Sequence, residues 1–287
     1  MIDDILAKFD GAFAENTIRA YRSDFTQYQT WCSQNKLKPI PASADTMAIY
    51  VDYLSNISKS ATIRRRINSL GTILKLSKNH DPTKDPEVVL ALKRMHRKIG
   101  RAQQQAAPLT KILLDQLLNN CDKSIRGIRN QVLLRLGYET MRRRSELCAF
   151  RFEDISNAAN SKPTIKLNFS KTDQYGAGKV LPISVDLATL LLQWREIAGT
   201  GGYILRSINR HGHTGSNLNS ASVSTILKGL QNNLNIAVTQ VSLSGHSFRV
   251  GAALDLLEQG EGIEKIMLRG GWQTDSTAMK YLRNWAF

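Results

Sequence analysis

The sequence predicts a mainly α protein of two domains, a helical bundle followed by a mostly helical domain with a small antiparallel β-sheet. Apolar residues recur at helical spacing through most of the 287 residues. One stretch departs from that spacing: Thr164–Phe169 alternates between apolar and polar residues, and Val180–Ile183 follows a glycine-rich turn. With 42% hydrophobic and 22% charged residues, the composition allows each domain to bury its own core.

The first hundred residues predict four amphipathic helices joined by short polar turns, a pattern typical of a small bundle. The helical stripes lie at residues 16–34, 41–54, 61–78 and 86–97. Residues 101–108 contain no bulky apolar side chain, which predicts an interdomain linker. We therefore expect domains at residues 1–100 and 109–287.

The second domain is predicted to be mostly helical, with helices before and after the sheet in the sequence. A helix begins at Thr110, and a buried helix follows over residues 128–139. The sheet is expected within residues 155–183. Further helices are predicted at residues 187–197, 220–234, 246–259 and 263–268.

The charge of the chain points to a polyanionic partner. The net charge is +15 and the isoelectric point is near 9.9, an excess typical of nucleic-acid-binding proteins. Residues 1–107 hold 17 basic and 10 acidic side chains, and residues 108–287 hold 22 and 14, so a polyanion is expected to contact both domains. Binding to a membrane surface, or solubility alone, would also account for the charge.

The three cysteines predict a reducing compartment. Cys32, Cys121 and Cys148 are widely spaced and form no CxxC motif, which disfavours a disulfide framework or a zinc site. No apolar run approaches the roughly 18 residues of a membrane span. The N-terminal segment lacks a basic start and an apolar stretch, so it is not a secretory signal. We expect a cytoplasmic protein that does not enter a membrane.

Two basic segments of the second domain are candidates for chemistry. In Met141-Arg-Arg-Arg-Ser-Glu-Leu, three consecutive arginines follow a largely apolar helix, where burial is costly unless an anion meets them. Ser170-Lys-Thr-Asp falls at the turn of the predicted hairpin, where a lysine is able to give a proton to a leaving oxygen. Taken alone, a solvated helix end and a solubilising lysine explain these segments as well.

Two later segments add a histidine, an arginine, a tryptophan and a tyrosine. His246 and Arg249 are three residues apart and share one face of a helix, whose N-terminus favours anions. Gly270 and Gly271 precede Trp272, which suggests a close backbone approach beside an indole N–H donor. Tyr281 follows near the end of the sequence. An exposed helix face and an ordinary aromatic anchor are the plain alternatives.

The order of these segments resembles the tyrosine recombinase (phage integrase) family. The resemblance covers nearly the whole chain, is closest to the Cre-like site-specific recombinases, and is most specific at residues 243–253, 266–272 and 281–284. The active arginine of the family lies three residues before a glutamate, so Glu146 selects Arg143 from the three arginines. The hairpin lysine of the family matches Lys171.

The resemblance implies a site-specific DNA recombinase that needs no metal and no ATP. Tyr281 would attack a phosphate and form a covalent 3′-phosphotyrosine, and strands would be exchanged in pairs through a Holliday junction. Arg143 and Arg249 would clamp the phosphate oxygens, and Lys171 would protonate the departing 5′ oxygen. Further donors would come from His246 and Trp272. Glu146 would orient the arginines, or it is simply structural.

The same resemblance implies how the chain meets DNA. Arg64, Arg65 and Arg66 lie on a predicted helix that enters the major groove in the family. Three successive residues span more than half of the circumference of a helix, so some of the three face outward. General solubility is the alternative for these three, and Lys98 and Arg101 are weaker candidates. The implied partner is double-stranded DNA with inverted-repeat target sites, bound by a tetramer on paired sites. The implied location is a bacterial, phage or plasmid context, at the nucleoid.

Other functions fit the sequence less well. A type IB topoisomerase shares the chemistry, but the small helical first domain favours recombination. A non-catalytic DNA-binding protein would not require all six candidate residues, and a nuclease would require an acidic metal cluster. Cre-like members carry a further helix after the tyrosine that docks on a neighbouring subunit. Only Leu282–Phe287 follow Tyr281 here, so we expect a different subunit linkage or a shortened chain.

Overall fold

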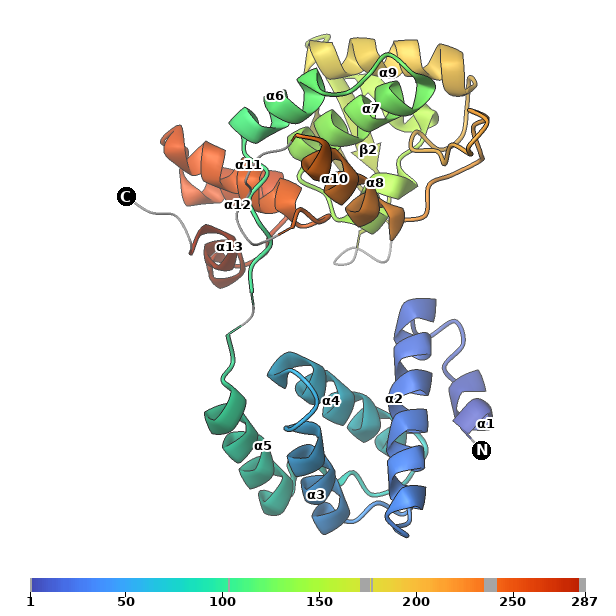
Figure 1. Ribbon diagram of the computed structural model, residues 1–287, viewed down its shortest axis with the longest axis vertical. Coiled ribbons are helices and arrows are strands. Elements are labelled where there is room, and N and C mark those ends of the chain that lie inside the picture. The colour runs from blue at the N-terminus through green and yellow to red at the C-terminus, as the bar shows by residue number, and fades with distance from the viewer. Residues whose placement is uncertain (1, 103, 171–175, 177, 235–241, 284–287) are drawn as a thin grey trace. The chain divides into compact units, whose positions relative to one another are not determined.

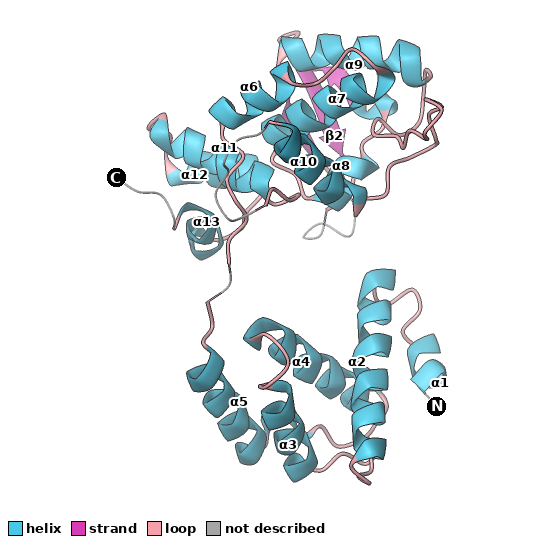
Figure 2. Ribbon diagram, in the orientation of Figure 1, coloured by secondary structure: helices cyan, strands magenta, loops and turns pink. Residues whose placement is uncertain are grey.

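The chain divides into two compact units, Met1–Gln104 and Gln105–Phe287. Both are seen in a computed structural model, which describes every residue except 1, 103, 171–175, 177, 235–241 and 284–287 (Figure 1). The described residues are mostly helical, with one three-stranded antiparallel sheet, which confirms the predicted fold class (Figure 2).

The first unit is a helical bundle. Its helices are α1 (Ile2–Ala7), α2 (Glu15–Gln34), α3 (Ala44–Leu54), α4 (Ser60–Leu76) and α5 (Pro86–Ile99). The last four match the predicted helices to within a few residues at each end. Helix α2 packs against α4, and α3 packs against α5. Helix α1 was not predicted, because one turn and a half of acidic sequence shows too little periodicity.

Aromatic rings fill the middle of this bundle. Tyr28 and Trp31 of α2 pack against Tyr50 of α3, with ring centroids 5.0 Å (Tyr28–Tyr50) and 4.8 Å (Trp31–Tyr50) apart. All three rings are buried. Burial of such large side chains contributes strongly to the hydrophobic stabilisation of this unit.

The second unit combines helices with a small sheet. The helices are α6 (Lys111–Asn119), α7 (Ile125–Thr140), α8 (Arg144–Ala149), α9 (Val185–Ala198), α10 (Ser222–Asn233), α11 (Ser247–Glu258), α12 (Ile263–Gly270) and α13 (Asp275–Leu282). The strands β1 (Ile155–Asn157), β2 (Pro163–Leu167) and β3 (Lys179–Pro182) pair in that order, with Ile165 opposite both Ile155 and Leu181. Helices α8 and α13 are six and eight residues long and were not predicted.

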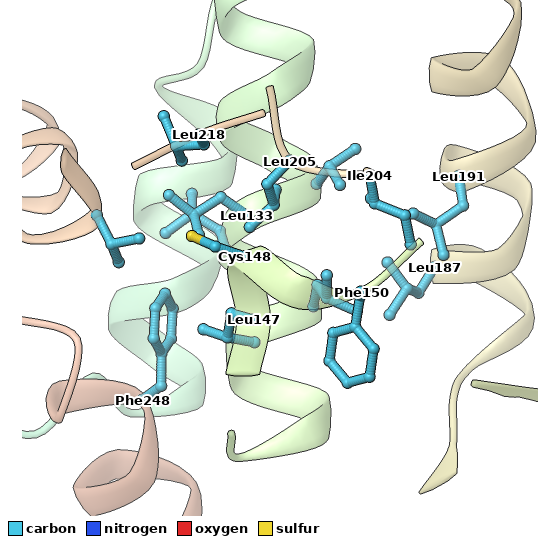
Figure 3. Packing of buried hydrophobic residues seen from close by; sticks show 14 of the residues in the cluster. Leu133, Leu147, Cys148, Phe150, Leu187, Leu191, Ile204, Leu205, Leu218 and Phe248 are labelled. Atoms are coloured by element: carbon cyan, nitrogen blue, oxygen red, sulfur yellow. The ribbon is translucent and has the colours of Figure 1, made fainter. Parts of the chain in front are cut away.

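Two hydrophobic clusters meet along α11. The larger one joins α7, α9 and the sheet, and it includes Phe248 of α11 (Figure 3). The smaller one joins the remainder of α11 to α12 and α13, and it includes Met141, Trp272 and Leu282. Because each cluster buries one side of α11, residues 247–256 are all buried. The helix that carries the predicted His-x-x-Arg pair is thus held on all sides.

Candidate active site

A sharp turn after α7 presents the three consecutive arginines in three different directions. Met141 ends α7 in the left-handed conformation, with φ 52°, which is uncommon for a residue other than glycine. The next three side chains differ in exposure: Arg142 is buried, Arg143 is partly exposed and Arg144 is exposed. The turn therefore separates three neighbours in sequence into three distinct environments.

Arg143 is held by Glu146, as expected for an oriented cation. The backbone N–H of Arg143 donates to Oε2 of Glu146 at 3.0 Å, and its Nη1 donates to Oε1 at 2.9 Å. Glu146 is the residue at the third position of α8 and is 4% exposed, whereas the Arg143 side chain is 24% exposed. A buried carboxylate thus fixes a guanidinium whose remaining donors are accessible to an anion.

Arg249 is a completely buried cation with unused donors. Its Nη1 donates to the carbonyl oxygen of Met141 at 2.7 Å. Its Nε and Nη2 have no hydrogen-bond partner among the described residues. A buried donor without a partner costs about 1–3 kcal/mol, more for a charged group, so these two N–H groups require an explanation. His246 lies at the N-cap of the same helix and is exposed.

Trp272 and Tyr281 pack over the Arg249 guanidinium. Their ring centroids are 4.7 Å apart, and they lie 4.8 Å (Trp272) and 5.4 Å (Tyr281) from Cζ of Arg249. Trp272 Nε1 is buried and, within the described chain, has no partner either. Tyr281 sits on α13 and is partly exposed.

The two glycines before Trp272 provide the close approach that the sequence predicts. A Cβ at Gly270 would lie 2.2 Å from the Trp272 ring. Gly271 caps α12 with φ 67°, a conformation that favours glycine, and a Cβ there would lie 2.6 Å from Nη1 of Arg142. The ring and the buried arginine therefore both pack directly on this turn.

The electrostatics of the site reflect several cations in one buried place. Burial lowers the pKa of Arg249, and the nearby Arg143 lowers it further, while Tyr281 and Glu146 oppose the shift. Burial, followed by repulsion from Arg249, lowers the pKa of Arg142 to about 10, so this side chain is still charged at neutral pH. Three arginines thus gather around one carboxylate, Glu146, an excess of positive charge suited to a phosphate.

Arg142 is the residue that sequence reasoning missed. The signal was present, because three arginines follow a largely apolar helix and the glutamate spacing selects only Arg143. Lys171, the predicted hairpin lysine, lies outside the described residues. Lys179, at the start of β3 on the other side of that hairpin, donates from Nζ to the carbonyl oxygen of Leu268 in α12.

The arginines predicted to contact DNA in the first unit differ from one another. Arg64 is exposed on α4. Arg65 donates through both terminal nitrogens to Asp24, a completely buried carboxylate of α2, and Arg66 approaches Asp24 at 3.9 Å with a largely buried side chain. Two of the three arginines therefore neutralise a buried acid.

Lys98 and Arg101, the two weaker candidates, are both exposed. Lys98 donates to Oδ1 of Asn56 at 2.6 Å. Across the described parts of both units, no group of three or more His, Cys, Asp or Glu residues is placed to hold a metal. None of the helices described is both long and apolar enough to cross a membrane.

Comparisons with known proteins agree with this geometry. Residues 108–286 match the phage integrase family. Recombinase Cre of Escherichia phage P1 is 26% identical over 95% of this chain and 85% of its own length, and an integrase/recombinase XerD homologue of Selenomonas ruminantium is 27% identical over 94% and 82%.

The fold is also that of lambda integrase. The structure of a dimer of its residues 75–356 on a COC′ core site gives a TM-score of 0.70 with 16% identity, covering 99% of this chain and 96% of that one. A lambda integrase tetramer on a Holliday junction gives 0.69 with 15% identity, covering 99% and 77%.

Proposed function

This chain belongs to the phage integrase family, and we propose that it is a site-specific tyrosine recombinase that cleaves and rejoins DNA through Tyr281. The observation that carries the proposal is the set of buried donors next to that tyrosine. Arg249 Nε, Arg249 Nη2 and Trp272 Nε1 lack partners among the described residues, and Tyr281 packs against both side chains. The non-bridging oxygens of a phosphodiester are acceptors that would satisfy all three.

The strand exchange that we propose begins with attack by the Tyr281 oxygen on phosphorus. A bond forms between that oxygen and phosphorus and the bond to the 5′ oxygen breaks, while the phenol gives up one proton and the departing 5′ oxygen gains one, so the step is balanced in protons. Negative charge accumulates on the phosphate oxygens, where Arg143, Arg249 and Trp272 would stabilise it. The covalent phosphotyrosine conserves the bond energy, and a 5′ hydroxyl from a second strand reverses the step and reseals the DNA.

Two further groups complete the proposed chemistry. Lys171 would protonate the departing 5′ oxygen, since a leaving alkoxide is far too basic to depart unprotonated at neutral pH. His246, exposed at the N-terminus of α11, would donate to a phosphate oxygen beside the helix dipole. Glu146 acts through Arg143, whose direction it fixes with two hydrogen bonds.

DNA must also open the site. Arg249 is 0% exposed, and the rings of Trp272 and Tyr281 lie over it. We infer that a phosphate reaches Nε and Nη2 only after side chains that cover Arg249, among them one of these rings, move aside. Contacts elsewhere along the duplex would provide the binding energy for that movement, which is how substrate binding is coupled to catalysis.

The first unit would bind the duplex, and the second would bind it and carry out the chemistry. Arg64 is the leading contact on α4, because Arg65 and Arg66 are engaged with Asp24. Lys98 and Arg101 would contact phosphates. We further propose inverted-repeat target sites, a tetramer on paired sites and a cytoplasmic, nucleoid-associated location. The tetramer seen for lambda integrase on a Holliday junction supports the assembly.

The test is covalent trapping on DNA. A target duplex is first selected by the wild-type chain from a randomised pool, and a nicked form of it is incubated with protein and run on a denaturing gel. We expect a protein–DNA adduct with the wild type and none with Tyr281→Phe, which loses only one hydroxyl and retains DNA binding. An adduct formed by Tyr281→Phe would show that another residue is the nucleophile.

A further inference from the structure

Cationic side chains from two other segments of the second unit donate hydrogen bonds to carbonyl oxygens at the C-terminus of α12. Lys179 of β3 donates to the carbonyl oxygen of Leu268, and Arg142 donates through Nη2 to the carbonyl oxygen of Arg269. The last carbonyls of a helix lack partners within the helix and carry partial negative charge, so both cations meet them favourably. Trp272 follows immediately and leads to α13 and Tyr281.

Arg142 joins this helix end to the end of α7. Its Nε donates to the carbonyl oxygen of Thr140 at 2.7 Å, while Nη2 reaches across to Arg269. Arg269 reciprocates, with Nη2 donating to the carbonyl oxygen of Glu139 at 3.2 Å. The arginine that follows α7 thus donates to the last turn of α12, and an arginine of α12 donates to the last turn of α7.

The local structure is built around a guanidinium at this position. Arg142 is 3% exposed, and the negative charge of Glu146 favours its charged form. The two carbonyl oxygens accept from two separate nitrogens of the planar guanidinium, Nε and Nη2, and the single Nζ of a lysine cannot occupy both positions. Gly271 packs on Nη1 so closely that a Cβ there would lie at 2.6 Å.

We propose that Arg142 is a positioning residue that fixes the Trp272–Tyr281 segment relative to Arg143 and Arg249. Arg142 and Arg143 are adjacent, so one turn of backbone directs one guanidinium to the phosphate and the other to the helix that precedes the nucleophile. The neighbouring Met141 carbonyl holds Arg249 through the same turn. This inference rests on the proposed function, because it assigns Arg142 a role in that reaction.

The test compares Arg142→Met with a matched control, Arg129→Met. Arg129 is also a buried arginine of the α7 region, 5% exposed, and its Nη1 donates to the backbone carbonyl of Arg206 at 3.0 Å. Burial lowers its pKa to about 10, as for Arg142. Both variants therefore lose one buried charge, but only Arg142→Met releases α12. Arg142→Lys is the second test variant, retaining the charge without the fork.

Three quantities are measured for each full-length variant: hydrogen exchange in Ile263–Leu282, affinity for the selected duplex, and the single-turnover rate of covalent attachment. We expect Arg142→Met to lose amide protection in that segment and to slow attachment about 10- to 100-fold relative to Arg129→Met, with affinity nearly unchanged. Arg142→Lys is expected to fall between Arg142→Met and the wild type.

Equal protection and equal attachment rates in Arg142→Met and Arg129→Met would overturn the inference. If Arg142→Met does not fold, a wild-type rate and wild-type protection in Arg142→Lys would overturn it as well, because the single Nζ of lysine does not reproduce the two-nitrogen fork. Failure of the proposed function looks different: the wild-type chain itself would form no adduct, while hydrogen exchange would still report whether Arg142 holds α12.

Discussion

Arg249 combines complete burial with two unused donors, an arrangement that is unfavourable unless something compensates for it. Two aromatic rings stack on the cation, and one backbone carbonyl accepts from it. Neither replaces the hydrogen bonds that Nε and Nη2 would form in water. A site that leaves charged donors unsatisfied without substrate is organised for the charge that develops during reaction.

Arg143→Ala and Arg249→Ala are expected to reduce the rate of covalent attachment by about 100- to 1,000-fold each, because each removes donors from the developing phosphate charge. The double variant should lose less than the product of the two factors, since residues that act as a unit are not additive. Single-turnover cleavage of the nicked duplex measures both. If the two rate losses multiply in the double variant, Arg143 and Arg249 do not act together on the same transition-state charge.

Lys171→Ala tests a proton donor rather than a charge. It is expected to slow cleavage of an ordinary duplex, and to recover most of the rate on a duplex with sulfur at the 5′ bridging position, since a thiolate departs without a proton. The same sulfur substrate should not rescue Arg249→Ala. A Lys171→Ala rate that stays low with sulfur would assign this lysine to charge stabilisation instead.

The elements show where sequence reasoning succeeded and where it failed. Long helices such as α2 and α4 were predicted nearly to the residue, because several turns of apolar stripe leave little choice. Helices α8 and α13 carry Glu146, the partner of Arg143, and Tyr281, the proposed nucleophile, yet they were missed because one or two turns show no clear period. The left-handed Met141 is set by tertiary contacts, so no local signal predicts that Arg142 turns inward.

The pairing of α4 with α2 separates arginines that look alike in the sequence. Arg64→Ala is expected to weaken DNA binding and to reduce the log–log salt slope by about 0.9 for each phosphate that the protein no longer neutralises, with little change in thermal stability. Arg65→Ala is expected to lower the melting temperature instead, because Asp24 is then buried without its bidentate partner. Salt titrations of DNA binding and thermal melts of both variants distinguish the DNA-contact role from the structural role. A stable Arg65→Ala that loses all affinity would reverse the assignment.

At the scale of the whole molecule, each unit has its own hydrophobic core. We therefore expect residues 1–104 and 105–287 to fold when produced separately, and each to bind the selected duplex more weakly than the full chain, since both carry excess positive charge. Circular dichroism and binding titrations test this. An unfolded second fragment would show that the units depend on each other for stability.

The rings over Arg249 also affect how the enzyme coexists with small anions in a cell. Free phosphate, sulfate and nucleotides carry the same oxygens as a phosphodiester and greatly outnumber any target site. If a ring must move before an anion reaches Arg249, as we propose, these small molecules would gain too little contact elsewhere to open the site. Under this proposal the tyrosine that reacts would also shield Arg249 from small anions until a duplex binds.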